Sequence, residues 1–504
     1  MSRHINRQVL GTAGVAAIAA ALGSVPVTGV AAIAATLPAV TPAVSDYVQV
    51  AASETPPTQA QCNSAGRRCF NPASTHAAYN VGPLYSAGFD GHGITIAIVD
   101  SYGSDTMAHD LHVYDQAWGL PAMCGEEGVT CTPGMPTFST LSLQGSPATK
   151  APPPTSKGTG QEDKSAWALE VALDVESAHA MAPGANILLV TTPTAETLGV
   201  QGLPQMMNAE QYVIDHHLAQ VITQSFGTAE EAFGSQQSLL NLRHAFVSAA
   251  ANHVTVLASS GDGGSANVRK SPVGGPNAQP TFPFPTVGWP ASDPLVTGVG
   301  GTYLCTDATA TSGRILDNVH PPVNCQAPNT EEEVGWIGSG GGFSHVFARP
   351  DYQSALPAGS TPIPATTRGV PDVALQASSR TGQLIYLSLP PDGQSGLICG
   401  SSPCSTGWYD VGGTSASSPQ WAALVAIADQ INGSGLGFIN PALYELANNP
   451  SAYASNFFDV TTGNNQADPS VPGFPATTGW DPVTGLGTPN ASALLPALVA
   501  AVNS

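Results

Sequence analysis

Four side chains in three separate stretches of the sequence have the types and spacing needed for nucleophilic catalysis. One is Ser415, which lies in a run of small residues from Gly412 to Pro419, just before the apolar segment 421–427. Small residues allow a tight turn that presents one hydroxyl before the chain enters a helix. A serine hydroxyl is a weak nucleophile without a base, so a simple helix cap is the alternative interpretation of this run.

Two acids, Glu170 and Asp174, interrupt an otherwise apolar stretch. Residues 166–175 read Ala-Trp-Ala-Leu-Glu-Val-Ala-Leu-Asp-Val, within a segment that we expect to be helical from 165 to 181. A helix that is apolar on every face is usually buried, and a spacing of four places both carboxyls on one face. Neighbouring carboxyls in a low dielectric share a proton, which suits a general base oriented by a second acid. The alternative, a helix with two solvated acids, is disfavoured because polar neighbours are missing.

Asp262 is the fourth side chain. It follows the apolar run 254–259 and lies in the glycine-rich turn 260–264. An ionised Asp262 would repel a developing oxyanion, whereas a protonated one would donate a hydrogen bond to it. A turn aspartate that accepts hydrogen bonds from its own backbone is the alternative interpretation.

These side chains need a scaffold, and the sequence predicts a doubly wound, mainly parallel α/β sheet with helices on both faces. Short apolar runs typical of buried parallel strands alternate with helical patterns at 165–181 and 238–251. In such a sheet, ligands bind beyond the carboxyl ends of the strands, and the first run ends in Asp100. The length of 504 residues fits a single large catalytic domain with an N-terminal extension. The expected strands are 93–100, 187–190, 221–223, 254–259 and 295–299.

The N-terminus has the features of an export signal. Arg3 and Arg7 precede an apolar run over residues 9–22, which is short for a membrane span and contains glycines. We therefore predict a cleaved signal peptide over residues 1–35 and a secreted, extracellular protein without a membrane anchor. Residues 36–74 begin with a stretch rich in Ala, Thr, Pro and Ser and are expected to form a short linker or prosegment.

The eight cysteines agree with export because they fall into four close pairs. Disulfides persist in oxidising compartments, and four local bridges that close surface loops are the simplest of the possible pairings. A zinc site is the alternative, but no two cysteines have the two-residue spacing of a zinc knuckle. The expected pairs are Cys62–Cys69, Cys124–Cys131, Cys305–Cys325 and Cys399–Cys404.

Acidic residues dominate the charge of the chain. The 14 Lys and Arg against 35 Asp and Glu give a net charge of −21, which disfavours nucleic acid and anionic membranes as partners. The small number of cations is compatible with work at low pH, because such a chain repels itself less once its carboxylates are protonated. Acidic secreted and halotolerant proteins share this composition.

In the order Glu170, Asp174, Asp262 and Ser415, these motifs resemble the sedolisin family of serine-carboxyl peptidases. That family has a subtilisin-like fold, a Ser-Glu-Asp triad and an aspartic acid in the oxyanion hole. The resemblance covers about residues 75–504 and implies one peptidase domain over that range. Further matching motifs are Tyr79–Leu84, Ile96–Asp100, Ala182–Ala185, Ser225–Gly227, Val299–Thr302, Ser339–Ser344 and Arg368–Val373.

The resemblance implies a role for each residue of the site. Ser415 attacks the scissile carbonyl, Glu170 takes its proton and later gives it to the leaving amine, and Asp174 orients Glu170. Asp262 and the backbone N–H of Ser415 stabilise the oxyanion. A glutamate base and a neutral aspartic acid donor coexist only in an acidic medium or if the pKa of Asp262 is strongly raised. We therefore expect hydrolysis of polypeptides through an acyl-enzyme, fastest at acidic pH.

The same resemblance implies one structural calcium ion near the C-terminus, held by two aspartates and several backbone carbonyls. Calcium accepts such an all-oxygen set without strict geometry. Without the resemblance, the segment reads as a glycine loop with Asx turns. The matching residues are Asp459, Val460, Thr477, Gly479 and Asp481.

Two alternatives and one departure stand beside this interpretation. A subtilisin-type peptidase would pair Asp100 with a histidine, but the sequence lacks the His-Gly-Thr-His motif, and His109, His112 and His179 occur in other contexts. A secreted binding module without catalysis is disfavoured because all four catalytic positions are filled. The departure is the short segment between the predicted signal and the catalytic motifs, where the family has a long prodomain. We expect a monomer. The sequence does not decide the cleavage preference, or whether the protein acts as an endopeptidase or as a tripeptidyl-peptidase.

Overall fold

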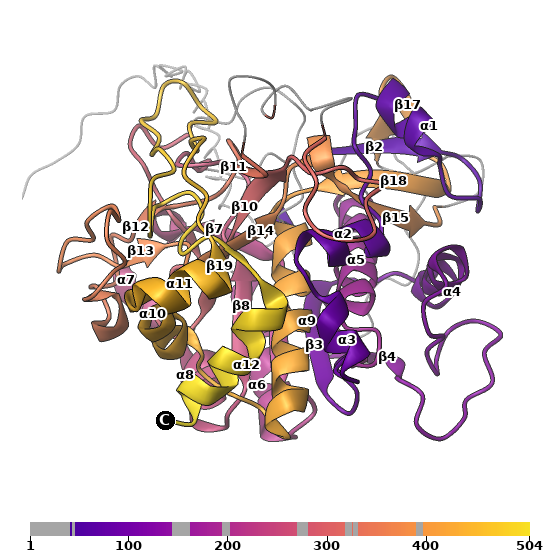
Figure 1. The fold of residues 1–504 in the computed structure, drawn as a ribbon, viewed down its shortest axis with the longest axis horizontal. Helices are drawn as coiled ribbons and strands as arrows, with labels where there is room; N and C mark the ends of the chain where they lie inside the picture. The colour runs from indigo at the N-terminus through magenta and orange to yellow at the C-terminus, as the bar shows by residue number, and fades with distance from the viewer. Residues whose placement is uncertain are drawn as a thin grey trace, which may run out of the picture. The chain divides into compact units, whose positions relative to one another are not determined.

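A central sheet of eight strands organises the protein in this computed structural model (Figure 1). The structure describes residues 41–42, 46–143, 162–193, 202–269, 281–317, 325, 331–389 and 397–504. The strand order is β11-β10-β8-β6-β3-β5-β4, with β14 also paired to β10. Neighbouring strands are parallel except for β10 and β11, which are antiparallel. The strands are β3 (Thr95–Ser101), β4 (Phe138–Ser142), β5 (Asn186–Thr192), β6 (Val221–Gln224), β8 (Thr255–Ser259), β10 (Thr297–Leu304), β11 (Glu333–Gly335) and β14 (Val373–Gln376).

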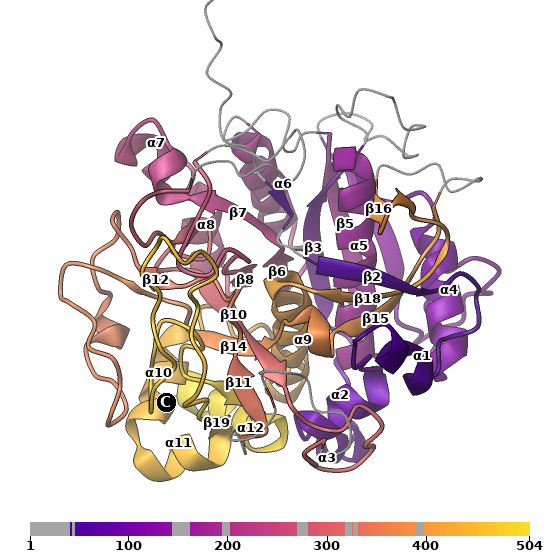
Figure 2. The ribbon, with the colours of Figure 1, turned by 90° about the horizontal axis from the view of Figure 1, so that it is seen from above.

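Strand β3 shows why this sheet is covered on both faces. Its successive side chains point to opposite sides, as in any strand. Ile96 and Ile98 lie in one hydrophobic core with helices α5 (Glu162–Met181) and α9 (Thr414–Asn432). Ala97 and Val99 lie in a second core with α6 (Leu203–Asp215) and α8 (His244–Ala251). Figure 2 shows α6 and α8 on one side of the sheet and α9 on the other. The predicted α/β class, with a mainly parallel sheet and helices on both faces, is confirmed.

The remaining elements surround this sheet. The other α-helices are α1 (Gln59–Ser64), α2 (Pro72–Ala78), α3 (Gly82–Ser86), α4 (Met107–Trp118), α7 (Gln236–Leu240), α10 (Asn440–Asn448), α11 (Pro450–Asn456) and α12 (Ala491–Val502). A three-stranded sheet holds β1 (Thr41–Pro42), β7 (Phe226–Ala229) and β9 (Gly288–Trp289), and another holds β15 (Gln383–Leu387), β18 (Gly407–Gly412) and β2 (Asp46–Ala51). Three short pairs are β12 (Gly342–Phe343) with β13 (Gly369–Val370), β16 (Ile398–Cys399) with β17 (Ser402–Pro403), and β19 (Phe457–Phe458) with β20 (Thr488–Pro489).

The segment predicted as a linker or prosegment contains ordered elements. Strand β2 pairs with β18, and Asp46 at its start forms an ion pair of 2.8 Å with Arg67. Helix α1 and the start of α2 follow before residue 75. Residues Leu37–Ser504 form one compact unit, and the predicted signal peptide over 1–35 lies outside the described residues. In the part of the chain that the structure describes, every helix is too short or too polar to span a bilayer.

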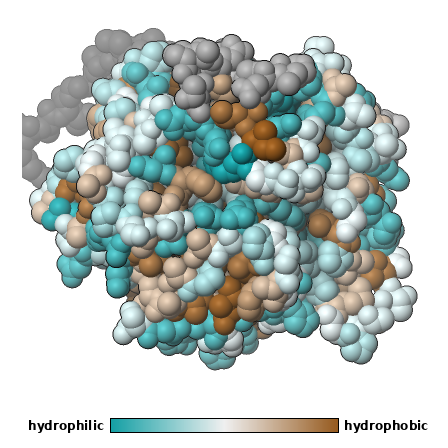
Figure 3. Space-filling view, in the orientation of Figure 1, coloured by the Kyte–Doolittle hydropathy of each residue, from teal (hydrophilic) through white to brown (hydrophobic). Residues whose placement is uncertain are grey.

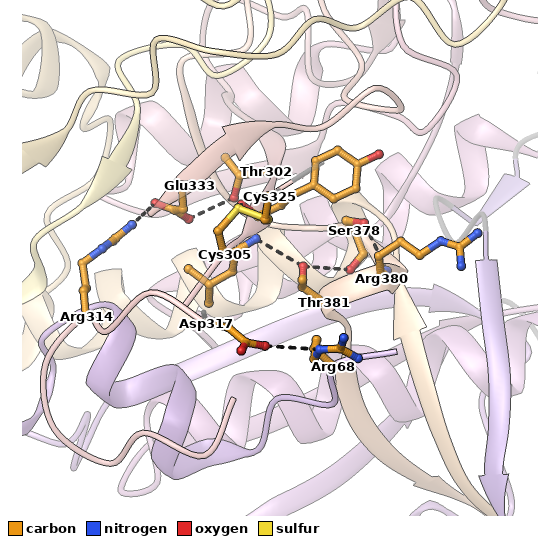
Figure 4. The surroundings of a disulfide bond; sticks show 12 residues. Arg68, Thr302, Cys305, Arg314, Asp317, Cys325, Glu333, Ser378, Arg380 and Thr381 are labelled. Carbon is orange, nitrogen blue, oxygen red and sulfur yellow. Dashed lines mark hydrogen bonds and ion pairs between the residues drawn. A yellow bond between two sulfur atoms is a disulfide. The ribbon is translucent and has the colours of Figure 1, made fainter. Parts of the chain in front are cut away.

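The four local disulfides are present as predicted. Figure 4 shows the surroundings of Cys305–Cys325, which lies at the end of β10. Arg68 forms an ion pair with Asp317 at 3.3 Å there, and Arg314 forms one with Glu333 at 2.7 Å. These ion pairs fasten the segment after β10 to β11 and to the residues before α2. On the face drawn in Figure 3, hydrophobic residues form small patches separated by hydrophilic ones.

Candidate active site

Helix α5 carries the acid pair. It spans Glu162–Met181, three residues longer at its start than the predicted helix. Glu170 and Asp174 are both fully buried, because the other side chains of residues 166–175 are apolar and pack in the cores. The Oδ1 atom of Asp174 accepts a hydrogen bond of 3.0 Å from the hydroxyl of Ser225, which lies between β6 and β7. Helix α5 and the residue that follows β6 therefore both fix the position of the Asp174 side chain.

Ser415 lies in the first turn of α9, directly after β18. The chain turns at Gly413, whose φ of 131° favours glycine. A side chain at Gly412 would place its Cβ 2.2 Å from the backbone nitrogen of Ser379, so this position also requires glycine. The two glycines thus allow the strand to end and the helix to begin within one residue, with the Ser415 hydroxyl at the helix start.

Asp262 lies in the turn after β8, next to the same helix start. The backbone N–H and the hydroxyl of Thr414 both donate to Asp262 Oδ1, at 2.8 and 2.9 Å. The N–H of Gly261 in turn donates to the Thr414 hydroxyl at 3.0 Å. Asp262 is only partly buried. These bonds fix the carboxyl of Asp262 beside the residue that precedes Ser415.

The other three predicted residues all affect the pKa of Glu170. Burial raises the pKa of Glu170 well above its usual value, and the charges of Asp174, Asp100 and Asp262 raise it further. The Ser415 hydroxyl lowers the same pKa, although Ser415 Oγ has no partner at full hydrogen-bond geometry. Burial also raises the pKa of Asp174, with Asp100 adding to the effect and the Ser225 hydroxyl opposing it. The predicted residues therefore converge on one carboxyl.

Asp100 is a fifth residue of this group, which the sequence analysis did not assign to it. It lies near the carboxyl end of β3, is fully buried, and neither of its oxygens has a hydrogen-bond partner. Burial raises its pKa to about 8. The sequence did offer one signal for Asp100, an acid at the end of an apolar strand. Its closeness to Glu170 and Asp174, however, depends on the packing of α5 on β3.

The histidines named in the subtilisin-type alternative have other partners. His109 contacts Glu127, His112 contacts Glu126, and His179 contacts Asp115. These contacts lie on α4, on the loop after it and on the last turns of α5. The Ser415 hydroxyl instead acts on the carboxyl of Glu170, whose pKa it lowers.

The predicted calcium ligands come from two segments that the fold brings together. Asp459 follows β19, and the N–H of Gly479 donates to both of its carboxylate oxygens at 3.0 Å. Asp481 is fully buried and accepts from the N–H groups of Thr477, Val483 and Thr484. Among the described residues, no group of three His, Cys, Asp or Glu side chains has the geometry of a metal site. The predicted set contains two such side chains, with the remaining ligands on the backbone.

Known proteins similar to this chain are peptidases. No family model matches it. Kumamolisin from Bacillus sp. (strain MN-32) is 30% identical over 449 residues, which are 88% of this chain and 66% of kumamolisin. Tripeptidyl-peptidase 1 from Mus musculus is 31% identical over 366 residues, which are 68% of this chain and 54% of that protein. The chain thus spans somewhat less than two thirds of the first relative and about half of the second.

A solved structure supports the same grouping. It is Pseudomonas sedolisin, described as a serine-carboxyl proteinase, complexed with two molecules of pseudo-iodotyrostatin. The TM-score is 0.60 and the identity 26%, over 85% of this chain and 97% of that one. The fold and these relatives agree. This chain belongs to the sedolisin family of serine-carboxyl peptidases.

Proposed function

We propose that this protein is a secreted peptidase that hydrolyses peptide bonds of polypeptides at acidic pH. The observation that carries the proposal is the convergence of Asp174, Asp262 and Ser415 on the buried carboxyl of Glu170. In its ionised form, a carboxyl beside a serine hydroxyl is a base that can accept the proton of that hydroxyl. The relatives named above are peptidases, which supports the same class of reaction.

The chemistry follows from the positions of these groups. Ser415 Oγ attacks the carbonyl carbon of the scissile bond while its proton passes to a carboxylate oxygen of Glu170. Glu170 then protonates the leaving amine, and the acyl-enzyme forms. Water attacks the ester with Glu170 again as base, and the returned proton restores Ser415. Asp174, fixed by Ser225, shares a proton with Glu170 and holds its orientation.

Two donors would stabilise the oxyanion of each tetrahedral intermediate. The first is the backbone N–H of Ser415 at the start of α9, where the helix dipole favours negative charge. The second is the carboxyl of Asp262, which donates only while it is protonated. Thr414 donates two hydrogen bonds to Oδ1 of Asp262, which fixes the orientation of this carboxyl. Activity should therefore fall as the pH rises toward neutrality.

The N-terminal segment would cover this site before maturation. Strand β1 pairs with β7, which directly follows Ser225, and β2 pairs with β18, which leads to Ser415. Ser415 is fully buried, so a substrate needs this region to open. We propose residues 1–35 as signal peptide, 36–74 as linker or prosegment, and 75–504 as the peptidase domain.

One calcium ion would stabilise the C-terminal part of this domain. Asp459 and Asp481 would supply carboxylate oxygens, and Val460, Thr477 and Gly479 backbone carbonyls. Burial raises the pKa of both aspartates, to about 7 for Asp481, and a divalent cation would offset the cost of ionising them. The ion would connect two segments and take no part in the chemistry.

The experiment is digestion of a denatured protein from pH 3 to 7, with cleavage sites mapped by mass spectrometry. Ser415→Ala and Glu170→Gln should abolish cleavage, and the exposed Ser401→Ala should not change it. Retained activity in Glu170→Gln would favour a histidine base instead. Lack of cleavage by the parent chain after its N-terminal segment has been removed, together with no labelling by a peptide aldehyde, would identify a binding module without catalysis.

A further inference from the structure

A second group of buried ionisable side chains lies away from the catalytic residues, where α4 and the loop after it dock on α5. We call it the α4 cluster: Asp115 and His112 from α4, Glu126 from the loop, and His179 from α5. His179 Nε2 lies 3.1 Å from Asp115 Oδ2 and 3.2 Å from the carbonyl oxygen of Pro121. His112 Nδ1 lies 3.1 Å from Glu126 Oε2. Asp115 also lies close enough to Glu126 for its charge to act on that carboxyl.

Three of the four side chains of the cluster are closed to solvent, and the cluster joins three parts of the chain. The side chains of Asp115, Glu126 and His179 are at most 1% exposed, and that of His112 is 34% exposed. Glu126 also accepts a hydrogen bond from the N–H of Met123, which fixes the loop. Asp115 and Glu126 repel each other when both are ionised, and His179 attracts Asp115 most strongly when His179 is charged. The cluster therefore holds α4 and the loop on α5 best when protons are bound.

Other ionisable groups face the cluster from every neighbouring element. On α5, Glu176 accepts from the N–H of Tyr386 at 2.8 Å and adds a further buried carboxyl. On α4, Asp110 accepts from the N–H of Ser388 at 3.1 Å. The remaining groups are Tyr114 and His109 on α4, Glu127 paired with His109 on the surface, Tyr386 on β15, and His76 on α2, which contacts the carbonyl of Ala180. Carboxyls outnumber histidines in this set, so loss of protons leaves excess negative charge.

The two central groups respond to pH in the same direction. Burial raises the pKa of Glu126 to about 7, with Asp115 adding to the effect. Burial alone lowers the pKa of His179, but Asp115, Glu126 and the carbonyl of Pro121 together outweigh burial and raise that pKa. Below about pH 6, Glu126 is therefore neutral and His179 is charged. As the pH rises through about 7, Glu126 ionises beside Asp115. His179 loses its charge as the pH rises through its own raised pKa, so both groups make the folded state less stable at higher pH.

We propose that the α4 cluster is a proton-dependent clasp, which holds α4 and the loop over residues 119–131 on α5 in acid and releases them near neutral pH. Helix α5 also carries Glu170 and Asp174, so release would remove the support of the helix that carries the proposed base. The clasp acts on structure and does not depend on the proposed peptidase activity. It would limit the protein to acidic surroundings even if the catalytic groups could work at neutral pH.

The test is hydrogen exchange followed by mass spectrometry on the full chain with Ser415→Ala, which excludes self-digestion. Protection is compared at pH 5 and pH 8 after correction for the intrinsic exchange rate. We expect protection over residues 107–131 to fall at least about tenfold, since a pKa shift of one unit corresponds to a tenfold change. Peptides from α9 should lose less protection than residues 107–131 over the same pH change. An equal loss in both regions would overturn the proposal.

Three variants assign the effect to the cluster. Glu126→Gln keeps the acceptor for Met123 but cannot ionise, so it should retain protection over 107–131 at pH 8. His179→Gln removes the charge that pairs with Asp115, so it should lower protection at pH 5 and match the parent at pH 8. Glu127→Gln, next in sequence but exposed, should behave as the parent. If Glu126→Gln fails to fold, His179→Gln tests the proposal alone. A change in protection between pH 5 and pH 8 as large in His179→Gln as in the parent would refute the clasp.

Discussion

Single residues in this site are defined by what surrounds them more than by their type. Glu170, Asp174 and Asp100 are all carboxyls without exposure to solvent, yet only Asp174 has a hydrogen-bond donor at good geometry, Ser225. Unpaired buried charge is costly, so this group keeps protons to a pH at which exposed carboxyls have lost theirs. The same property supplies a proton to share among the carboxyls next to Ser415.

Asp100 should act in its protonated form. Its pKa is raised to about 8 by burial, so at pH 4 to 5 it is neutral and can donate a hydrogen bond to a neighbouring carboxyl. Asp100→Asn keeps that shape and a donor, and we expect kcat/KM within about threefold of the parent at pH 4.5. Asp100→Ala removes the donor and leaves a hole, and it should lose at least about tenfold. A loss in Asp100→Asn as large as in Glu170→Gln would mean that Asp100 works ionised.

At the scale of elements, the site depends on a junction between the turn after β8 and the start of α9. Thr414 makes this junction, because it donates two hydrogen bonds to Asp262 and accepts one from Gly261. Its hydroxyl takes part in two of the three. The orientation of Asp262 therefore depends on a side chain that has no chemical role of its own.

Thr414→Val tests this junction. It keeps the shape and the backbone N–H but removes the hydroxyl, so Asp262 loses one donor and the Gly261 N–H loses its acceptor. We expect kcat to fall about tenfold, with little change in KM, because the loss concerns the transition state. The free energy of unfolding should fall by about 1 kcal/mol, the usual worth of a hydrogen bond. Thr414→Ser should restore kcat; a variant as slow as Thr414→Val would contradict this account.

Elements were predictable from the sequence where local pattern and burial agree. The apolar run that ends at Asp100 and the apolar helix around Glu170 are β3 and α5, since both are buried on all sides. The approach of Asp100 to Glu170 was not predictable, because it depends on how α5 packs against β3. The pairing of β2 with β18 was also missed, because residues 46–51 pair with a strand more than 350 positions away and carry little periodicity of their own.

At the scale of the molecule, the proposed calcium ion would join the segment after β19 to the loop over residues 477–481. Chelation should lower Tm by more than about 5 °C at pH 5, because the buried Asp481 would then have to hold a proton or an uncompensated charge. Differential scanning calorimetry with and without a chelator measures this. Asp481→Asn should show a low Tm that the chelator no longer changes, and an unchanged melt of the parent would count against the ion.

Maturation should depend on the site itself. If the segment with β1 and β2 covers Ser415, activity should appear with a lag after acidification, together with loss of N-terminal residues. Ser415→Ala should keep its N-terminus under the same conditions, as read by intact mass. Loss of the segment in Ser415→Ala would show that another agent removes it, and immediate full activity with an intact N-terminus would show that the segment does not cover the site.

The free energy of unfolding of the whole molecule should fall as the pH rises. It would rise with pH in a protein whose acids are mostly ion-paired with cations. Burial raises the pKa of Asp110 to about 6 and of Asp429 to about 8, and it raises the pKa of Glu210 well above its usual value. Such groups bind protons more tightly when folded, so their contribution is fully present below pH 4 and is lost as the pH rises through the folded-state values. Tm of Ser415→Ala should therefore be higher at pH 5 than at pH 8 by more than about 5 °C. Asp429→Asn, which keeps an acceptor for the N–H of Leu436, should reduce that difference; a Tm that rises between pH 5 and 8 would refute the argument.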